Sequence, residues 1–385
     1  MSEKWRSSTW GEEISLEYGK SNRTYNTEKG RFRVYGSNGP IGWTDTALVN
    51  EPGVVLGRKG AYRGVQFSKT PFFVIDTAYY VKPKNGNDIK WLYYAIISDK
   101  LGEIDDGSPI PSTTRSAVYV REIDVPPIKE QKAIASILGS LDDKIDLNRR
   151  TNETLEALAR ALFRDWFVDF GPTRAKMAGE APYLAPELWK LFPDRLDDER
   201  KPEGWKITRI GDCIERLKVG TLYSQKDLEL SGTIPVLDQG KNGIIGYHNN
   251  APNIVATPNE RICTFANHTC TQKLIDFPFS TIQNVIPFKG KNFPSEWIFF
   301  ATLGKQNFQE YKGHWPDFVE QTICTPDKSD VMNFYRKMID PMLNKQSENT
   351  REIETLTQLR DLLLPKLMSG EISIRDAEKM VEDAA

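Results

Sequence analysis

Basic side chains in a glycine-flanked turn are the residues of this sequence best suited to chemistry. Residues 54–64 read Val-Val-Leu-Gly-Arg-Lys-Gly-Ala-Tyr-Arg-Gly, which predicts a strand, a compact turn that projects Arg58, Lys59 and Arg63, and a second strand. The planar fork of an arginine can pair with O6 and N7 of guanine, and a lysine ammonium suits a phosphate. The turn is therefore a candidate contact with DNA, and an ordinary charged hairpin is the alternative.

This turn lies in a basic stretch of a chain that is not basic overall. The net charge is −2, yet nine basic residues stand against three acidic ones between Lys20 and Lys69. Lys20, Arg23 and Arg31 are the further candidate contacts within it. A solvated surface explains such a stretch as simply as a phosphate-binding patch does, so charge alone does not decide between them.

The chain also repeats itself, with an offset that drifts from about 200 to about 206 residues. Residues 3–5, Glu-Lys-Trp, recur as Glu-Gly-Trp at 203–205, and Trp91 in Trp-Leu-Tyr-Tyr-Ala recurs as Trp297 in Trp-Ile-Phe-Phe-Ala. Near the place of the basic turn the second copy carries Asn267 and His268. An amide and an imidazole in place of basic groups are expected if the two copies read different bases.

Loops that precede the predicted long helices supply the remaining candidates. Residues 107–115 and 313–317 are polar loops whose tips could enter a DNA groove, and the glycine turns at 36–39 and 240–243 are turns first and contacts second. The candidate DNA-binding residues of the whole chain are Lys20, Arg23, Arg31, Arg58, Lys59, Arg63, Thr113, Arg115, Lys218, Lys241, Asn267, His268, Lys273, His314 and Trp315.

No catalytic constellation or metal site is predicted. The sequence has no phosphate-binding glycine motif, no Gly-x-Ser-x-Gly elbow and only three histidines. Cys263, His268, Cys270, His314 and Cys324 do not have the spacing of a structural zinc site, and the first copy has no ligand residues at the corresponding place. Partly buried free thiols explain the cysteines better. No cofactor is expected to bind this chain.

Two other functions remain open at this stage. One is a DNA nuclease with an unrecognised acidic metal site, for which Asp317 and Glu320 are available. The other is a pure assembly scaffold without DNA preference. The four cysteines form no Cys-x-x-Cys pair, and no run approaches the roughly 18 apolar residues of a membrane span, so we expect a cytoplasmic protein without a membrane partner.

The elements that position these side chains change character near residue 125. Residues 5–125 predict short strands and tight turns, interrupted by a helix around 89–101, and Trp91 and Trp297 are expected in the core. Apolar residues then recur at alternating spacings of four and three, which is the seam of a coiled coil. The first seam is Ile134, Leu138, Leu141, Ile145, Asn148, Asn152, Leu155, Ala159, Leu162 and Trp166; the second is Tyr335, Ile339, Met342, Gln346, Asn349, Ile353, Leu356, Arg360, Leu363 and Leu367.

Both seams carry polar residues near their middle, Asn148 and Asn152 in one copy and Gln346 and Asn349 in the other. We interpret them as buried amides that pair across two helices and fix their register; a fluctuation on a surface helix is the alternative. The first helix, from about 129 to 164, would span roughly 50 Å. In the second copy Asp340-Pro341 predicts a helix start, and Leu364-Pro365 predicts a bend or an end.

The predicted fold class is therefore α+β. Two similar globular domains, with mixed strands and short helices, are separated by two long antiparallel coiled-coil helices in a pseudo-two-fold internal repeat. The predicted boundaries are 1–125 for the first domain, 126–170 for the central spacer helix, 171–202 for a connector, 203–330 for the second domain and 331–385 for the C-terminal spacer helix. The connector is expected to pack on the helices.

With these features the whole chain resembles the specificity (S) subunits of type I restriction-modification systems. The resemblance rests on the duplicated domain-and-helix order, Gly57-Arg58-Lys59-Gly60 after a strand, Val-Pro-Pro-Ile-Lys-Glu-Gln at 125–131, and the helix endings at 162–170 and 364–372. It implies two target-recognition domains that each read one half of a bipartite sequence in double-stranded DNA, with the helices as a ruler for the spacer.

The resemblance also implies partners that carry the chemistry. Two methyltransferase (M) subunits would dock on the helices with S-adenosylmethionine and methylate adenine N6, and restriction (R) subunits would bring ATP and Mg. The second copy has no clear counterpart of residues 126–131, which leaves the start of its helix open.

Overall fold

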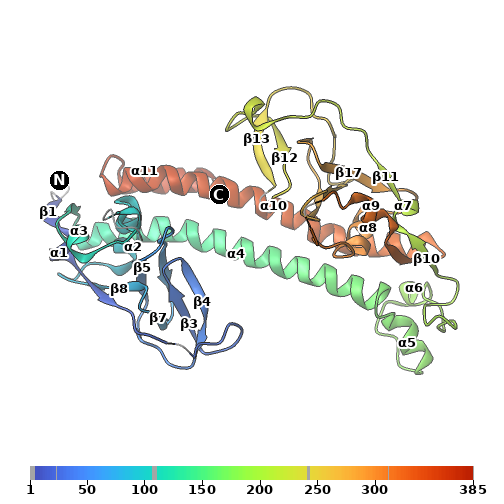
Figure 1. The fold of residues 1–385 in the computed structure, drawn as a ribbon. Helices are drawn as coiled ribbons and strands as arrows, with labels where there is room; N and C mark the ends of the chain where they lie inside the picture. Colours follow the sequence, from blue (N-terminus) through green and yellow to red (C-terminus); the bar gives the residue numbers. More distant parts are fainter. Residues whose placement is uncertain (1–4, 23, 106–110, 241–242, 311, 385) are drawn as a thin grey trace. The chain divides into compact units, whose positions relative to one another are not determined.

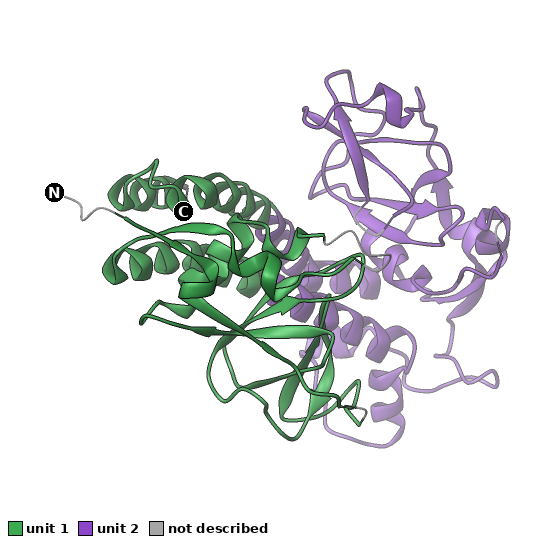
Figure 2. Ribbon diagram, turned by 60° about the vertical axis from the view of Figure 1, so that its left-hand side comes forward, with its two compact units in different colours: residues 1–148, 351–385 green, residues 149–350 purple. Residues whose placement is uncertain are grey.

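The computed structural model describes residues 5–22, 24–105, 111–240, 243–310 and 312–384 of the chain. These residues form two compact units, residues 1–148 together with 351–385, and residues 149–350 (Figure 2). Each unit contains one strand-rich module, which we call module 1 (residues 6–125) and module 2 (residues 206–325). The candidate residues Arg23 and Lys241 lie outside the described residues.

Module 1 consists of three small sheets and short helices. In its main sheet the strands β2 (Ile14–Tyr18), β8 (Ala78–Pro83), β5 (Gly53–Gly57) and β6 (Val65–Ser68) are neighbours in this order, and all pairs are antiparallel. A three-stranded sheet has β3 (Phe32–Gly36) between β4 (Gly39–Thr44) and β7 (Phe72–Val74), and β1 (Arg6–Thr9) pairs with β9 (Glu122–Val125). The helices are α1 (Trp10–Glu13), α2 (Ile89–Ser98), η1 (Leu101–Glu103) and α3 (Arg115–Tyr119).

Module 2 repeats this topology strand for strand. Its sheets are β11-β17-β14-β15, β13-β12-β16 and β10-β18, which correspond one by one to β2-β8-β5-β6, β4-β3-β7 and β1-β9. Even the irregular register recurs, between Val34 and Tyr35 in β3 and between Val236 and Leu237 in β12. The internal repeat and the α+β fold class predicted from the sequence are confirmed. The bounds in module 2 are β10 (Lys206–Arg209), α7 (Ile210–Cys213), β11 (Ile214–Arg216), η2 (Gln225–Asp227), β12 (Ile234–Leu237), β13 (Ile244–His248), β14 (Ile262–Ala266), β15 (Gln272–Ile275), β16 (Ser280–Thr281), β17 (Val285–Gly290), α8 (Ser295–Thr302), α9 (Trp315–Glu320) and β18 (Thr322–Thr325).

Two helices of 40 residues each, α4 (Ile128–Phe167) and α10 (Ser329–Met368), follow the modules (Figure 1). Within the first unit Asp142 contacts Arg360 and Asn148 contacts Glu352, and within the second unit Asn152 contacts Gln346. As the residue number rises along α4 it falls along α10, so the two helices are antiparallel in each unit. Every one of the twenty predicted seam positions is buried or half-buried.

The second helix neither begins at Asp340-Pro341 nor ends at Leu364-Pro365. α10 starts at Ser329, 201 residues after the first residue of α4, and runs through Pro341 and Pro365 without interruption. Both prolines are exposed, so the carbonyl that each proline leaves without an intrahelical partner lies on the water-facing side of the helix. The predicted start at Asp340 was wrong for a further reason, because the Asp340 carboxylate accepts a hydrogen bond from Arg261 at 2.8 Å.

The polar seam residues form contacts between the helices. Asn349, only 1% exposed, donates to Oδ1 of Asn152 at 2.8 Å, and Gln346 donates to the carbonyl of Asn152 at 2.9 Å. Asn148 differs, because it donates to the carboxylate of Glu352 at 2.8 Å rather than to an amide. Their role in fixing the helix register stays a prediction.

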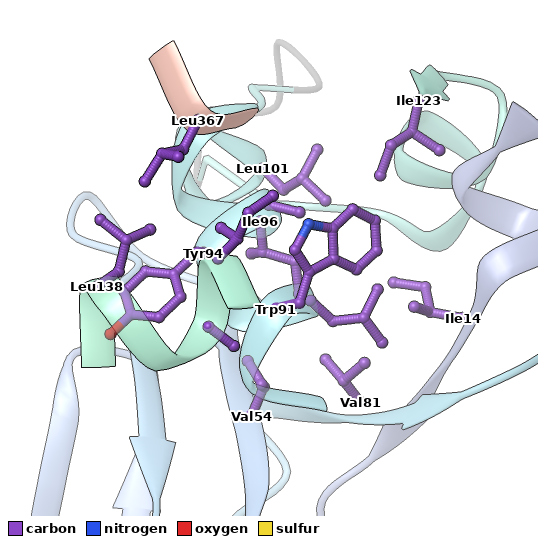
Figure 3. Close-up of a cluster of buried hydrophobic side chains, with 14 of the residues drawn as sticks. Ile14, Val54, Val81, Trp91, Tyr94, Ile96, Leu101, Ile123, Leu138 and Leu367 are labelled. Carbon is purple, nitrogen blue, oxygen red and sulfur yellow. The ribbon is translucent and has the colours of Figure 1, made fainter. Parts of the chain in front are cut away.

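Each unit has one main apolar core that joins its module to the helices. Figure 3 shows the core of the first unit, where Trp91 of α2 lies among side chains of the main sheet, and Leu138 of α4 and Leu367 of α10 belong to the same cluster. In the second unit Trp297 takes the place of Trp91 and packs against Phe163 and Phe167 of α4. Both tryptophans are fully buried, as the sequence predicted.

Short helices cover the ends of the two cores. The connector forms α5 (Gly171–Met177) and α6 (Pro186–Trp189), and its Leu188 and Phe192 are buried in the second unit. In the first unit α11 (Ile374–Ala384) buries Ala377 in the core. The connector is thus packed on a helix end, as expected.

Candidate nucleic-acid interface

The two modules place Arg58 and Asn267 at the same point of the fold. Arg58 follows the central strand β5, its N–H donates to the carbonyl of Thr77 at 3.0 Å, and its carbonyl accepts from the N–H of Thr113 at 2.9 Å. Asn267 follows the equivalent strand β14, donates to the carbonyl of Asn284 at 2.8 Å, and accepts from the N–H of His314 at 2.8 Å. The backbone is therefore the same at a position where one copy carries a guanidinium and the other an amide.

Arg58 and Arg115 meet over one tyrosine. The guanidinium carbon of Arg115 lies 4.2 Å from the ring centre of Tyr18, and that of Arg58 lies 5.0 Å from it. Tyr79 forms the base of this cluster, with its ring centre 5.0 Å from that of Tyr18, and burial raises its pKa to about 12. The carboxylate of Glu17 lies 3.7 Å from Arg115. Two cations and one anion at the end of β2 make a local positive centre.

The corresponding positions of module 2 carry Lys218, Asn267 and Trp315. Tyr18 is the fourth residue after Ile14, where β2 begins, and Lys218 is the fourth after Ile214, where β11 begins. Arg115 and Trp315 are the first residues of α3 and α9. We call these two sets, Tyr18-Arg58-Arg115 and Lys218-Asn267-Trp315, the strand-end triads. Five of the six residues belong to the candidates predicted from the sequence.

The side chains of the second triad are held more tightly by the module itself. Oδ1 of Asn267 accepts the N–H of Trp315 at 2.8 Å, which fixes the amide at the start of α9. The half-buried Trp315 ring packs against Phe265, Phe288 and Phe318 at centroid separations between 5.5 and 5.8 Å. Lys218 is exposed.

Arg63 and Thr113 shape the loop from within. The Arg63 guanidinium donates to the carbonyls of Gly60, Gly102 and Ile104 at 2.6, 3.0 and 2.9 Å, and to Oγ1 of Thr113 at 3.2 Å. Thr113 is completely buried, and the loop turns its polar side chain inward toward the carbonyls around it; its contact with DNA stays a prediction. Arg63 positions the turn that carries Arg58 and Lys59.

His314 is likewise buried, and its contact with DNA also stays a prediction. Its Nε2 donates to the carbonyl of Glu310 at 3.1 Å, and Nδ1 lies 3.4 Å from the amide of Gln306. His268 is half-buried, with Nδ1 donating to the carbonyl of Lys312 at 2.9 Å. Both imidazoles therefore stabilise the loop before α9 through hydrogen bonds to its carbonyls.

The remaining candidates are distributed over the modules. Lys20, Arg31 and Lys59 are exposed in module 1. Lys273 of β15 is half-buried, and burial lowers its pKa although Asp238 opposes the shift. Their contact with DNA stays a prediction.

Two tyrosines were missed by the sequence reasoning. Tyr62, at the tip of the basic turn, is 77% exposed, and Tyr18 is 46% exposed although it lies over Tyr79. An aromatic residue within a run of basic residues is a signal that could have drawn attention to Tyr62. Tyr18 has no such local signal, because its arginine partners are distant in sequence.

The polar side chains that could suggest a catalytic site are engaged in contacts within module 2. His248 accepts the N–H of Asn250 on Nδ1 at 3.0 Å, so its proton is on Nε2, which donates to Oγ of Ser280 at 2.9 Å; in this tautomer the imidazole is no base for that serine. The two carboxylates of the nuclease alternative pair with cations, Asp317 with Lys312 and Glu320 with Arg209.

Among the described residues no group of three or more His, Cys, Asp or Glu side chains is arranged to hold a metal ion. The four cysteines are free, and burial raises the pKa of the Cys213 thiol to about 11. Within the same residues no helix has the length and apolarity needed to cross a bilayer.

Comparison with known proteins agrees with this arrangement. Residues 4–157 match the family model described as the type I restriction modification DNA specificity domain. The chain is 24% identical over 352 residues to the type I restriction enzyme MjaIX specificity subunit of Methanocaldococcus jannaschii, covering 84% of this chain and 78% of that protein. It is 25% identical over 375 residues to the HindI specificity subunit of Haemophilus influenzae, covering 78% and 81%.

The fold is also that of a solved relative. The crystal structure of the type I restriction-modification S subunit from M. genitalium matches with a TM-score of 0.64 at 17% sequence identity, over 94% of this chain and 96% of that one. Both halves of the present fold thus fall within the match. The duplicated module and the antiparallel helix pair agree with these comparisons, and the chain is similar to type I restriction-modification specificity subunits.

Proposed function

We propose that this chain is the non-catalytic subunit that reads a bipartite DNA target for a type I restriction-modification complex. The observation that carries the proposal is the pair of strand-end triads. One backbone framework presents Tyr18, Arg58 and Arg115 in module 1 and Lys218, Asn267 and Trp315 in module 2. A framework that is kept while its projecting side chains change is what two readers of different base sequences require.

The helices support the bipartite part of the proposal. A continuous helix of 40 residues is about 60 Å long at 1.5 Å per residue, whereas half-sites one helical turn apart on DNA are separated by about 34–36 Å. A helix pair of this length can act as a ruler that sets the unspecified spacer between the half-sites. Its antiparallel register, with Asn152 opposite Gln346 and Asn349, would define that length.

The chemistry is proposed to come from partner subunits. Two M subunits would bring S-adenosylmethionine and adenine methylation, and R subunits would bring ATP and Mg to the assembled complex in the cytoplasm. The support is the similarity of the chain to type I specificity subunits, together with His248, Asp317 and Glu320, whose side chains are engaged in contacts within module 2. The nuclease alternative has no support, because Asp317 and Glu320 are each paired with a cation.

Methylome sequencing followed by binding measurements tests the proposal. Single-molecule sequencing of methylated adenines in the native genome should reveal a two-part motif, and the complex assembled with this chain should shift DNA carrying it in an electrophoretic assay. Exchange of either half-site should weaken the shift at constant salt. Assembly with partners but no preference for the motif would mean that the chain is a scaffold only.

A further inference from the structure

We propose that Arg58 and Arg115, held on Tyr18, recognise guanine in the half-site that module 1 contacts. This inference rests on the proposed function, because it assumes that module 1 meets DNA. It assigns a chemical class of ligand, the O6 and N7 edge of guanine in the major groove, to the first strand-end triad.

The first step is that the two arginines have donors to spare. Within the described residues the guanidinium of Arg58 forms no hydrogen bond or ion pair, and its Nε is buried without a partner. Nε of Arg115 is also buried without a partner, so the Nη groups are the donors that can reach a base, and Nη2 of Arg115 lies 3.7 Å from Glu17 in an ion pair. Arg63, five residues after Arg58, makes four hydrogen bonds within the module. Its guanidinium therefore has a structural role, which the guanidinium of Arg58 does not share.

The second step is that the arginines are positioned in advance. Tyr18 offers one ring to both guanidinium groups, at 4.2 and 5.0 Å, and Tyr79 supports that ring from the sheet. A guanidinium over an aromatic face keeps its N–H donors at the edge of its plane, where they remain available to an acceptor. Two acceptors side by side, as in O6 and N7 of guanine, match this fork. The aromatic contacts reduce the side-chain freedom that binding would otherwise remove.

The third step decides between a base and a phosphate. Phosphates are the same in every duplex, so a phosphate contact has no chemical reason to change between duplicated modules. The three positions of the triad change completely, from Tyr-Arg-Arg to Lys-Asn-Trp, while the order of the strands and helices that carry them is retained, as are the backbone hydrogen bonds on both sides of Arg58 and Asn267. Arginine pairs with O6 and N7 of guanine, and an amide does not offer the same fork, so the replacement of Arg58 by Asn267 is a change expected of a base reader.

Selection of binding sites from randomised DNA tests this proposal. The complex assembled with the wild-type chain should enrich a motif whose first half contains guanine. Arg58→Ala should lose roughly 5- to 150-fold of discrimination at one guanine position and leave the second half-site unchanged. Replacement of that guanine by 7-deazaguanine, which lacks N7, should weaken the wild type and leave Arg58→Ala unaffected.

Matched variants separate the arginine pair from general effects. Arg121→Ala removes the same side chain from an exposed place in module 1 and should leave base preference intact. Tyr18→Phe keeps the ring and should retain the guanine preference, whereas Tyr18→Ala should reduce it. A second-half preference that persists in every variant shows that the protein is folded.

Two results would overturn the inference. An equal loss at all base positions, with a smaller salt dependence, would make Arg58 and Arg115 phosphate contacts. A first half-site without guanine at the position sensitive to Arg58 would remove the assigned ligand. A wild-type complex with no DNA preference at all is a different outcome, because it rejects the proposed function itself.

Discussion

Replacement of Arg261 is predicted to destabilise the second unit strongly. This arginine precedes β14 and is 2% exposed. Its guanidinium donates to Glu296 of α8 at 3.1 Å, and to Asp340 and Asn344 of α10 at 2.8 and 2.5 Å. Arg261 therefore connects module 2 to the long helix α10 through buried and partly buried ion pairs.

The magnitude follows from the charge left behind. Removal of one partner from a buried ion pair costs about 3–5 kcal/mol, because the remaining charge is desolvated without compensation. Arg261→Met keeps most of the apolar stem and leaves Glu296, which is 2% exposed. Arg336 lies 3.4 Å from Glu296 and offers partial relief, so we expect about 3 kcal/mol, the lower end of the range.

Urea denaturation of the full chain, with hydrogen exchange to assign the loss to the second unit, measures the effect. The double variant Arg261→Met with Glu296→Met should lose much less than the single variant, because neither buried charge of that pair then remains. Arg195→Met breaks an exposed pair, because the side chains of Arg195 and Glu203 are 70% and 51% exposed, and it should have little effect on stability. If Arg261→Met costs no more than Arg195→Met, the reasoning is refuted.

Three other predictions concern pH and the helix pair. Burial raises the pKa of Glu13, but hydrogen bonds from three neighbouring side chains outweigh burial and hold the pKa below 4.5. The ionised carboxylate should therefore stabilise the folded state fully above pH 4.5, and this stabilisation should be lost as the pH falls through the lowered pKa of the folded state. Glu13→Gln should flatten this part of an acid-unfolding curve. Asn349→Leu leaves Oδ1 of Asn152 without its donor and should cost about 1–3 kcal/mol in urea, whereas leucine at both positions should restore stability; equal losses would contradict the pairing. Four residues inserted after Asn148 in α4, with four inserted opposite in α10, should lengthen the ruler by about 6 Å and give a methylome motif with a longer spacer; an unchanged spacer would reject the ruler.

The sequence predicted the features that many residues encode together. The internal repeat extends over nearly the whole chain, and the seam from Ile134 to Trp166 keeps its alternating spacing over ten positions. The start of α10 depends on fewer residues, and local rules for Asp340-Pro341 misplaced it because an exposed proline is tolerated on the water-facing side of a packed helix.

The candidate site was predictable only in part, and for a different reason. Arg58 and Asn267 were found because each directly follows a strand of the repeat. The burial of Thr113 and His314 was not predicted, because sequence does not reveal which side of a loop faces the buried carbonyls. Tyr18 was missed because its contact with Arg115 joins residues 97 positions apart, which only the tertiary fold brings together.

The division into units has a consequence for the order in which the chain acquires structure. Residues 149–350 form one unit from a single continuous segment, whereas the other unit needs residues 351–385 to complete the core that contains Leu356, Leu363 and Leu367. During synthesis module 2 is therefore the first to have all the residues of its unit available. Part of the apolar surface of module 1 stays uncovered until residues 351–385 emerge. Ribosome-stalled chains in which residue 350 has just emerged from the exit tunnel should accordingly protect module 2 from protease while module 1 is still cleaved.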